Sequence, residues 1–140
     1  MASPLDIAVT GLTAQTRRVE ASASNTANAR TRGALPDANG TVPEGKPAAY
    51  RPLGVAQSEQ RLGTDAAGTR ATFTPITPAY LAEYDPQAGV ADARGMVAAP
   101  NVDLAGEAVN QIAAGRAYAA NIAVARTADE MQKSLLDSTV

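Results

Sequence analysis

A run of glycines ending in a lysine, Gly40-Thr41-Val42-Pro43-Glu44-Gly45-Lys46, has the spacing of a phosphate-binding loop. In such loops the backbone amides and the lysine hold phosphate groups, a Ser or Thr after the lysine binds magnesium, and a helix follows. Here Pro47 follows the lysine, and proline cannot open a helical turn that donates its amide to a phosphate. We therefore expect no nucleotide and no other cofactor to bind this chain.

Three aspartates, Asp85, Asp92 and Asp103, could suggest a calcium site, but their spacing matches no EF-hand loop and is typical of turns. The chain has no Cys and no His, which excludes thiolate nucleophiles, Ser-His-Asp triads, Cys/His zinc sites and imidazole bases. We expect no catalytic and no metal-binding residue. The enzymatic alternative is a carboxylate-based hydrolase, for which no pair among the 14 acidic residues has a recognisable context.

The composition of the 140 residues narrows the class of protein further. Twelve basic and 14 acidic side chains give a net charge of -2, without the basic cluster that nucleic acid requires. No apolar run is long enough for a membrane span, and the N-terminus has no pattern of a secretory signal peptide. The 32 alanines outnumber the large aliphatic residues, so we expect a weakly stable lone monomer whose helices approach each other closely. A nucleic acid or small-molecule partner is not expected.

Prolines and glycines concentrate between Gly33 and Pro100, which leaves the two ends of the chain as long helices. The segment Ser3-Pro4-Leu5-Asp6 predicts the start of a helix over residues 3–29, and Asn101 or Asp103 predicts the cap of a second helix that ends near residue 136. Apolar and small residues recur in both at spacings of three and four.

The middle of the chain is predicted to be β-rich. Short strands are expected over residues 48–55, 69–74 and 79–84, and a mobile loop over residues 33–47. The predicted fold class is mainly α, with two long terminal helices packed as a coiled-coil-like pair and an irregular β insert between them. The expected organisation is an N-terminal helix (1–32), a β-rich middle region (33–100) and a C-terminal helix (101–140).

Polar side chains interrupt the apolar stripe of each terminal helix, and a two-helix core would bury them poorly. An interface between chains explains these polar groups, because polar residues at helix seams fix register between partners. Tyr118 has the mixed apolar and hydrogen-bonding character common at such contacts. The alternative is a pair of helices packed within one domain. The interrupting residues are Gln15, Asn25 and Asn28 in the first helix and Asn110, Arg116 and Asn121 in the second.

Both ends of the chain resemble a known family, the axial proteins of the bacterial flagellar rod and hook. At the N-terminus the matching segments are Gly11-Leu12-Thr13-Ala14-Gln15, Arg18-Val19 and Ala23-Ser24-Asn25-Thr26-Ala27-Asn28. At the C-terminus they are Pro100-Asn101-Val102-Asp103-Leu104, Ala108-Val109-Asn110-Gln111-Ile112, Arg116-Ala117-Tyr118-Ala119-Ala120-Asn121 and Thr127-Ala128-Asp129-Glu130-Met131. The short middle region is similar to that of the proximal rod proteins within this family.

The resemblance implies a structural subunit of the proximal rod, the torque-transmitting shaft of the flagellar basal body, exported by the flagellar type III system. Implied partners are copies of itself, other rod proteins, and membrane-ring and export-gate components at the rod base. From the stripes and matched segments, we expect the subunit interface to contain Leu5, Leu12, Gln15, Val19, Asn25, Asn28, Asn101, Val102, Asp103, Val109, Ile112, Arg116, Tyr118, Asn121, Thr127, Met131 and Leu135.

Two alternatives to a proximal rod subunit stay open at the level of sequence. One is another short rod component, because these proteins share their end signatures and differ mainly in the middle. The other is a self-contained soluble adaptor domain that uses both helices internally. A cooperative melt of the isolated monomer would favour the adaptor.

Overall fold

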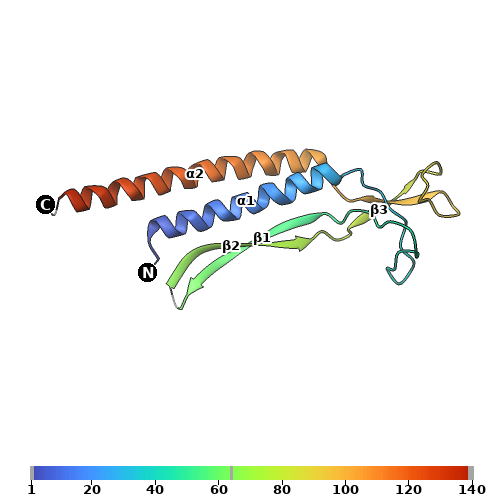
Figure 1. Cartoon of the computed structure of the whole chain (residues 1–140), viewed down its shortest axis with the longest axis horizontal. Helices are drawn as coiled ribbons and strands as arrows, with labels where there is room; N and C mark the ends of the chain where they lie inside the picture. The colour runs from blue at the N-terminus through green and yellow to red at the C-terminus, as the bar shows by residue number, and fades with distance from the viewer. Residues whose placement is uncertain (1, 64, 139–140) are drawn as a thin grey trace. The chain divides into compact units, whose positions relative to one another are not determined.

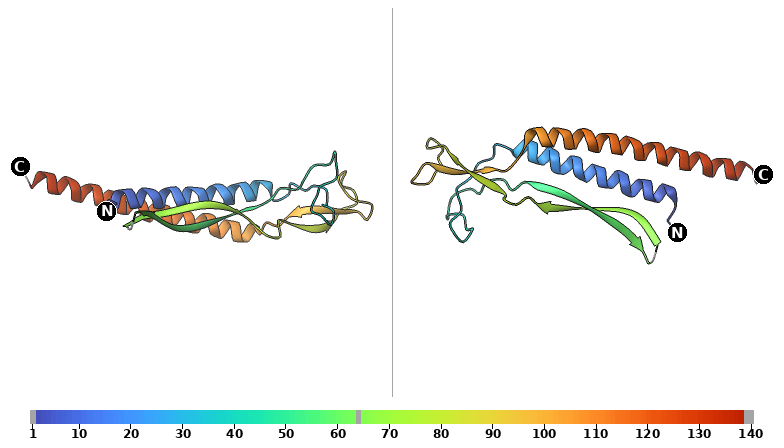
Figure 2. Two further views of the ribbon diagram at one scale, coloured as in Figure 1. Left: turned by 90° about the horizontal axis from the view of Figure 1, so that it is seen from below. Right: turned by 180° about the vertical axis from the view of Figure 1, so that it is seen from behind.

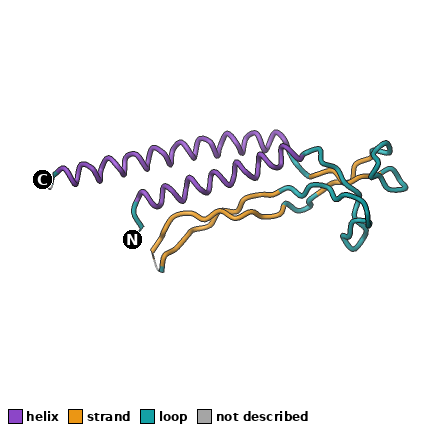
Figure 3. Tube along the Cα trace, viewed as in Figure 1, coloured by secondary structure: helices purple, strands orange, loops and turns teal. Residues whose placement is uncertain are grey.

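The computed structural model in Figure 1 describes residues 2–63 and 65–138. Helices occupy both ends of the chain and strands the middle, as Figure 3 shows, which confirms the predicted mainly α fold with a β middle region. In chain order the elements are α1 (Pro4–Asn28), β1 (Leu53–Leu62), β2 (Asp65–Pro75), β3 (Tyr80–Tyr84), β4 (Met96–Pro100) and α2 (Leu104–Asp137).

Helix α1 begins with the predicted reciprocal cap between Ser3 and Asp6. The Asp6 amide donates to Ser3 Oγ at 3.1 Å, while the Ser3 amide and hydroxyl donate to Asp6 Oδ2 at 3.2 and 2.7 Å. Pro4 takes the first helical position, where its missing N–H costs nothing. These local interactions fix the start of the helix because they satisfy amides that have no partner inside it.

Helix α2 is capped by Asp103, one of the two predicted candidates. Its Oδ1 accepts a hydrogen bond from the Ala105 amide at 3.0 Å, and its carbonyl accepts the first helical bond from the Glu107 amide at 2.8 Å. The other candidate, Asn101, instead donates its side-chain amide to the Pro78 carbonyl at 2.9 Å. At about 1.5 Å per residue, the 34 residues of α2 extend about 51 Å.

The strands form two separate two-stranded sheets, β1–β2 and β3–β4. In the second, antiparallel sheet Tyr80 lies opposite Pro100 and Tyr84 opposite Met96. The strand expected over residues 48–55 is corrected, because β1 starts at Leu53 and continues to residue 62. The polar residues 57–61 have low β propensity, so only pairing with β2 makes them a strand. The partner strand β4 was also not predicted.

The chain divides into two compact units, and each helix contributes to both. Unit 1 contains residues 1–20, 55–73 and 109–140, and unit 2 contains residues 21–54 and 74–108. Within unit 1, α1 lies between α2 and the β1–β2 sheet (Figures 1 and 2). Where side chains are described, the buried apolar residues of this unit are the alanines Ala8, Ala14, Ala71, Ala114 and Ala128. Because alanine is small, these elements approach closely while burying little apolar area per residue.

Unit 2 is built around β4 and the segment that follows α1. Gly33 and Ala98 exchange backbone hydrogen bonds of 3.0 and 2.9 Å, and the Val97 and Ala98 side chains are fully buried. The segment expected to be a loop, residues 33–47, forms no helix or strand apart from the bridge at Gly33, and its ends are joined by a hydrogen bond from the Ala34 amide to the Pro47 carbonyl at 2.9 Å. Lys46, which ends the phosphate-loop lookalike, donates to the Ala91 carbonyl at 3.0 Å and so serves the fold of this unit.

Candidate subunit interface

Asn25, near the end of α1, is a polar residue of unit 2 that is only 1% exposed. Its Nδ2 donates to the Leu53 carbonyl at 2.8 Å and to Glu107 Oε1 at 2.6 Å. Its Oδ1 accepts from the Leu53 amide at 2.9 Å and from the Tyr50 hydroxyl at 3.0 Å. The two donors and two acceptor positions of the amide are therefore all used within the chain.

The partners of Asn25 are themselves held by neighbouring residues. The Ser22 hydroxyl donates to the Glu107 carbonyl at 3.0 Å, and the hydroxyls of Ser24 and Tyr50 share a hydrogen bond of 2.9 Å. Glu107 is buried in the first turn of α2, where the positive end of the helix dipole favours its carboxylate. This network fixes the end of α1 against the start of α2.

Most of the large apolar side chains of α2 in unit 1 are exposed to solvent. Val109, Ile112, Met131 and Leu135 are each more than half exposed, whereas Ala114 is fully buried. A helix normally buries its large apolar residues and exposes its small and polar ones. The inverted pattern leaves an apolar surface that a second helix can cover.

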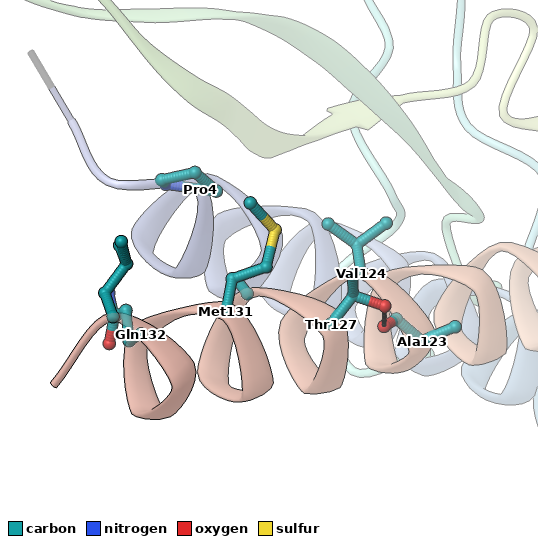
Figure 4. Close-up of a pocket in the computed structure, with 8 residues that line it drawn as sticks. Pro4, Ala123, Val124, Thr127, Met131 and Gln132 are labelled. Carbon is teal, nitrogen blue, oxygen red and sulfur yellow. Dashed lines mark hydrogen bonds between the residues drawn. The ribbon is translucent and has the colours of Figure 1, made fainter. Parts of the chain in front are cut away.

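An apolar groove of about 510 Å³ lies where α2 passes the first turn of α1 in unit 1. Val124 and Met131 point from α2 toward the turn that carries Pro4 (Figure 4). Residues 124 and 131 are seven apart, which places them on one face of the helix. The groove is lined by Pro4, Ala123, Val124, Thr127, Ala128, Met131, Gln132 and Leu135.

A second groove in unit 1, of about 450 Å³, lies between α1 and the β1–β2 sheet and contains three arginines, Arg17, Arg61 and Arg70. Arg17 donates to the Ala71 carbonyl at 2.5 Å, and its guanidinium lies 6.0 Å from the centre of the Phe73 ring. These contacts anchor Arg17 to strand β2 and hold its charge at the groove wall.

The predicted interface residues fall into three groups by exposure. Gln15 and Asn25 are buried, and Gln15 accepts a hydrogen bond from Arg18 at 3.2 Å. Half-buried are Leu5, Leu12, Asn28, Asn101, Val102 and Asn121. Exposed are Val19, Asp103, Val109, Ile112, Arg116, Tyr118, Thr127, Met131 and Leu135.

The structure brings only some of these predicted residues together. Thr127, Met131 and Leu135 share the apolar groove, and the half-buried Asn28 donates to the Ser24 carbonyl within α1 at 2.9 Å. Leu5 and Leu12 belong to unit 1, whereas Asn101, Val102 and Asp103 belong to unit 2.

Sequence reasoning missed residues that complete these surfaces. Pro4 was interpreted only as a helix start, yet it lines the apolar groove. Arg61 carried no signal, because the strand that places it beside α1 was not predicted, and Arg70 was assigned to the strand over residues 69–74 without a role in a site. Tyr50 and Leu53 were assigned to a strand, and their hydrogen bonds to Asn25 have no counterpart in any sequence pattern.

Three of the described ionisable groups have shifted pKa values: the exposed Asp6 and Lys133 and the half-buried Asp92. Hydrogen bonds from the Ser3 hydroxyl and amide hold the pKa of Asp6 below its ordinary value of 3.8. The Met96 amide, followed by contacts with Arg94, lowers the pKa of Asp92 in the same way. The hydrogen bond to Asp129 raises the pKa of Lys133 above 10.5. All three shifts favour the charged form, as expected for groups that cap turns or form ion pairs.

Among the described residues, no helix is both long and apolar enough to cross a bilayer, and no cluster of three His, Cys, Asp or Glu side chains could hold a metal ion. Unit 1 presents the two grooves and the exposed apolar row of α2. They are suited to protein contacts.

Comparison with known proteins gives concordant matches. Residues 93–138 match the family described as flagellar basal body rod FlgEFG protein C-terminal. The flagellar basal-body rod protein FlgC of Yersinia enterocolitica is 39% identical over 137 residues, which cover 96% of this chain and 92% of the relative. Proteins of the same name from Salmonella typhimurium and Agrobacterium fabrum are 37% and 31% identical, covering 94% of this chain and 92% and 89% of the relatives.

Proposed function

This chain belongs to the FlgC family of flagellar basal-body rod proteins, and from that premise we propose that it enters the rod through its two terminal helices. It is a structural subunit of the flagellar basal-body rod and assembles with other rod components. In the proposal, residues 1–32 and 101–140 form the rod core and residues 33–100 form an outer region. The chain has no catalytic role.

The observation that carries the proposal is the exposed apolar row of α2. Val109, Ile112, Val124, Met131 and Leu135 are each at least half exposed, while the buried apolar side chains described on the same helix are those of Ala114 and Ala128. Burial of a large aliphatic side chain contributes about 1.5–3 kcal/mol, and the lone chain gains little of this from these residues. Contact with a neighbouring helix would supply it, so assembly would stabilise the subunit.

Polar residues on the exposed helix surfaces would set the register of that contact. Arg116 and Tyr118 are exposed on α2, and Asn121 is half-buried on the side that faces α1. Gln15 and Asn25 are buried. In the proposal they therefore do not contact neighbouring subunits directly, and instead fix the position of α1 through hydrogen bonds within the chain. The further partners in the proposal are membrane-ring and export-gate components at the rod base. The flagellar type III apparatus exports the subunit, and the assembled rod transmits torque across the periplasm.

Aspartate substitutions in the exposed row test the proposal. In cells that lack their own copy of the protein, Met131→Asp and Val124→Asp are expected to abolish swimming and incorporation into purified basal bodies. The free energy of unfolding of the monomer, measured by thermal melting, should change by no more than about 0.5 kcal/mol, because both sites are exposed. Leu81→Asp is the matched control, since Leu81 is 54% exposed on β3 in the proposed outer region.

The outcomes separate the rod interface from the adaptor alternative. Loss of incorporation by the α2 variants, with normal incorporation of Leu81→Asp, supports a helix-mediated interface. Normal basal bodies from Met131→Asp and Val124→Asp would mean that the α2 row contacts no neighbour, and the proposal would fail. Equal loss from all three variants would also contradict it, because the effect would not depend on the helices.

A further inference from the structure

The arginine groove of unit 1 is a positively charged surface that the proposed helix contacts do not use. Thr10, Thr13 and Arg17 line it from α1, while Arg61 and Arg70 line it from the two strands. Among the residues whose side chains are described, its lining includes no carboxylate. At about 450 Å³ it has the size of a small-ligand pocket, so it takes side chains and not a whole helix.

The charges of this groove are only partly compensated within the chain. Arg61 donates to Glu59 Oε2 at 2.7 Å, in a pair whose side chains are 64% and 48% exposed. Arg17 donates to a neutral carbonyl. Among the residues whose side chains are described, Arg70 has neither a hydrogen bond nor an ion pair. Guanidinium groups bind carboxylates through paired hydrogen bonds, so an acidic group is the ligand that this groove fits.

The C-terminal end of α2 carries an excess of negative charge, opposite in sign to the charge of the groove. Its last turn contains no basic residue and ends on Asp137, where the helix dipole already places partial negative charge. Lys133, one turn earlier, is bound to Asp129 at 2.6 Å. Within the described residues Glu130 and Asp137 form no ion pair, although Lys133 also attracts the Glu130 carboxylate at longer range. A spacing of seven places Glu130 and Asp137 on one face of the helix. A cationic partner would stabilise this end.

We propose that the arginine groove of one copy receives the acidic end of α2, residues 130–137, from a second copy of this chain. This rests on the proposed rod function. Figure 1 shows that the end of α2 extends past the first turn of α1 within unit 1, so it is accessible to a neighbour. Glu130 and Asp137 enter the groove and pair with Arg61 and Arg70.

The contact joins two different surfaces of the same chain. Such a heterologous contact leaves a free groove on one copy and a free helix end on the other, so it propagates from subunit to subunit. A two-fold contact would instead close as a dimer. Head-to-tail propagation agrees with a shaft built of stacked subunits.

Charge reversal tests the pairing. Arg70→Glu and Asp137→Arg are each expected to weaken assembly into basal bodies by about tenfold, because like charges then face each other across the contact. The double variant Arg70→Glu/Asp137→Arg should recover most of that loss, which also shows that each altered chain folds. Arg30→Glu, at an exposed arginine of unit 2, is the control for the change in net charge. Additive losses in the double variant, or no loss in the single variants, would overturn the pairing.

Cysteine cross-linking tests the geometry, and the natural absence of cysteine makes it specific. Gln60→Cys lies in the groove and Ser134→Cys lies one turn after Glu130 on α2. In purified basal bodies, a short bifunctional thiol reagent should convert the double variant into a ladder of dimers, trimers and longer products of this chain. Gln60→Cys/Glu44→Cys is the control and should give no ladder.

Other products would overturn the inference and identify the true arrangement. Dimers alone indicate a closed contact, a product within one chain indicates self-docking, and a product with another rod protein indicates a different occupant. If the double variant enters the rod normally but gives no cross-linked product, the proposed contact is refuted while the rod function still stands. Failure of the unmodified chain to enter basal bodies would instead refute the rod function.

Discussion

Gly11 of α1 faces the side chain of Asn121 of α2 so closely that a Cβ on the glycine would lie 2.5 Å from the asparagine Oδ1. The Asn121 amide is held by a hydrogen bond of 2.9 Å to the Ala117 carbonyl. Glycine in the middle of a helix costs about 0.5–1 kcal/mol relative to alanine. Its presence at residue 11 therefore has a packing reason, which is the close approach of the two helices.

Gly11→Ala is expected to lower the melting temperature of the parent chain and to raise it in the Asn121→Ala background. In the parent the new methyl displaces Asn121, which costs about 1–2 kcal/mol in packing and a hydrogen bond. Without Asn121 only the helix-propensity gain of about 0.5–1 kcal/mol is left. Thermal unfolding followed by circular dichroism measures all four chains, and a change of the same sign in both backgrounds would contradict this contact.

Asn25→Leu is expected to destabilise the chain by about 2–4 kcal/mol. The change removes the hydrogen bonds that the amide makes with the buried Glu107 and the part-buried Leu53 and Tyr50. Denaturant unfolding measures the loss. Asn28→Leu is the matched control and should cost less than about 1 kcal/mol, because Asn28 is half-buried and donates only to the Ser24 carbonyl of its own helix. Similar losses for the two variants would show that the Asn25 network does not stabilise the fold.

The helix ends could be predicted from the sequence because their causes are local. Ser3, Asp6 and Asp103 lie within three residues of the amides that they cap, so the expected bounds of 3–29 and 101–136 lie close to the observed helices. Strand β1 was largely missed because its polar residues favour a strand only when β2 pairs with them.

The polar network around Asn25 shows why the candidate site was harder to predict than the helices. The sequence indicates that a polar group on the α1 stripe needs partners, but those partners lie 25, 28 and 82 residues away along the chain. Helical spacing relates residues three, four or seven apart, and it carries no information on such distant pairs. Only the folded backbone brings Tyr50, Leu53 and Glu107 to one amide.

Gly68→Ala is expected to destabilise the chain by about 3 kcal/mol, which combines left-handed backbone strain with a steric clash. Gly68 has φ of 111°, and an added Cβ would lie close against Thr10 Oγ1, which accepts a hydrogen bond from the Thr69 amide at 3.0 Å. Gly40→Ala is the control, because Gly40 has φ of 79° and nothing within 4 Å of the added carbon. It should cost only about 1–2 kcal/mol. Equal losses in urea unfolding would mean that α1 does not pack on β2 at Thr10.

Asp92→Asn is expected to reduce the acid sensitivity of the fold. The pKa of Asp92 lies below 3.8 in the folded chain because its carboxylate accepts hydrogen bonds from the Met96 amide and from Arg94. A carboxyl whose pKa falls on folding stabilises the chain fully above its unfolded pKa, and this contribution is lost as the pH falls through the folded value. The parent should therefore lose more stability than Asp92→Asn between about pH 5 and pH 2, measured as melting temperature against pH. Glu44→Gln, a neutralisation in the loop before Lys46, provides the control, and parallel pH profiles for the parent and Asp92→Asn would show that the turn before β4 gains nothing from the charge.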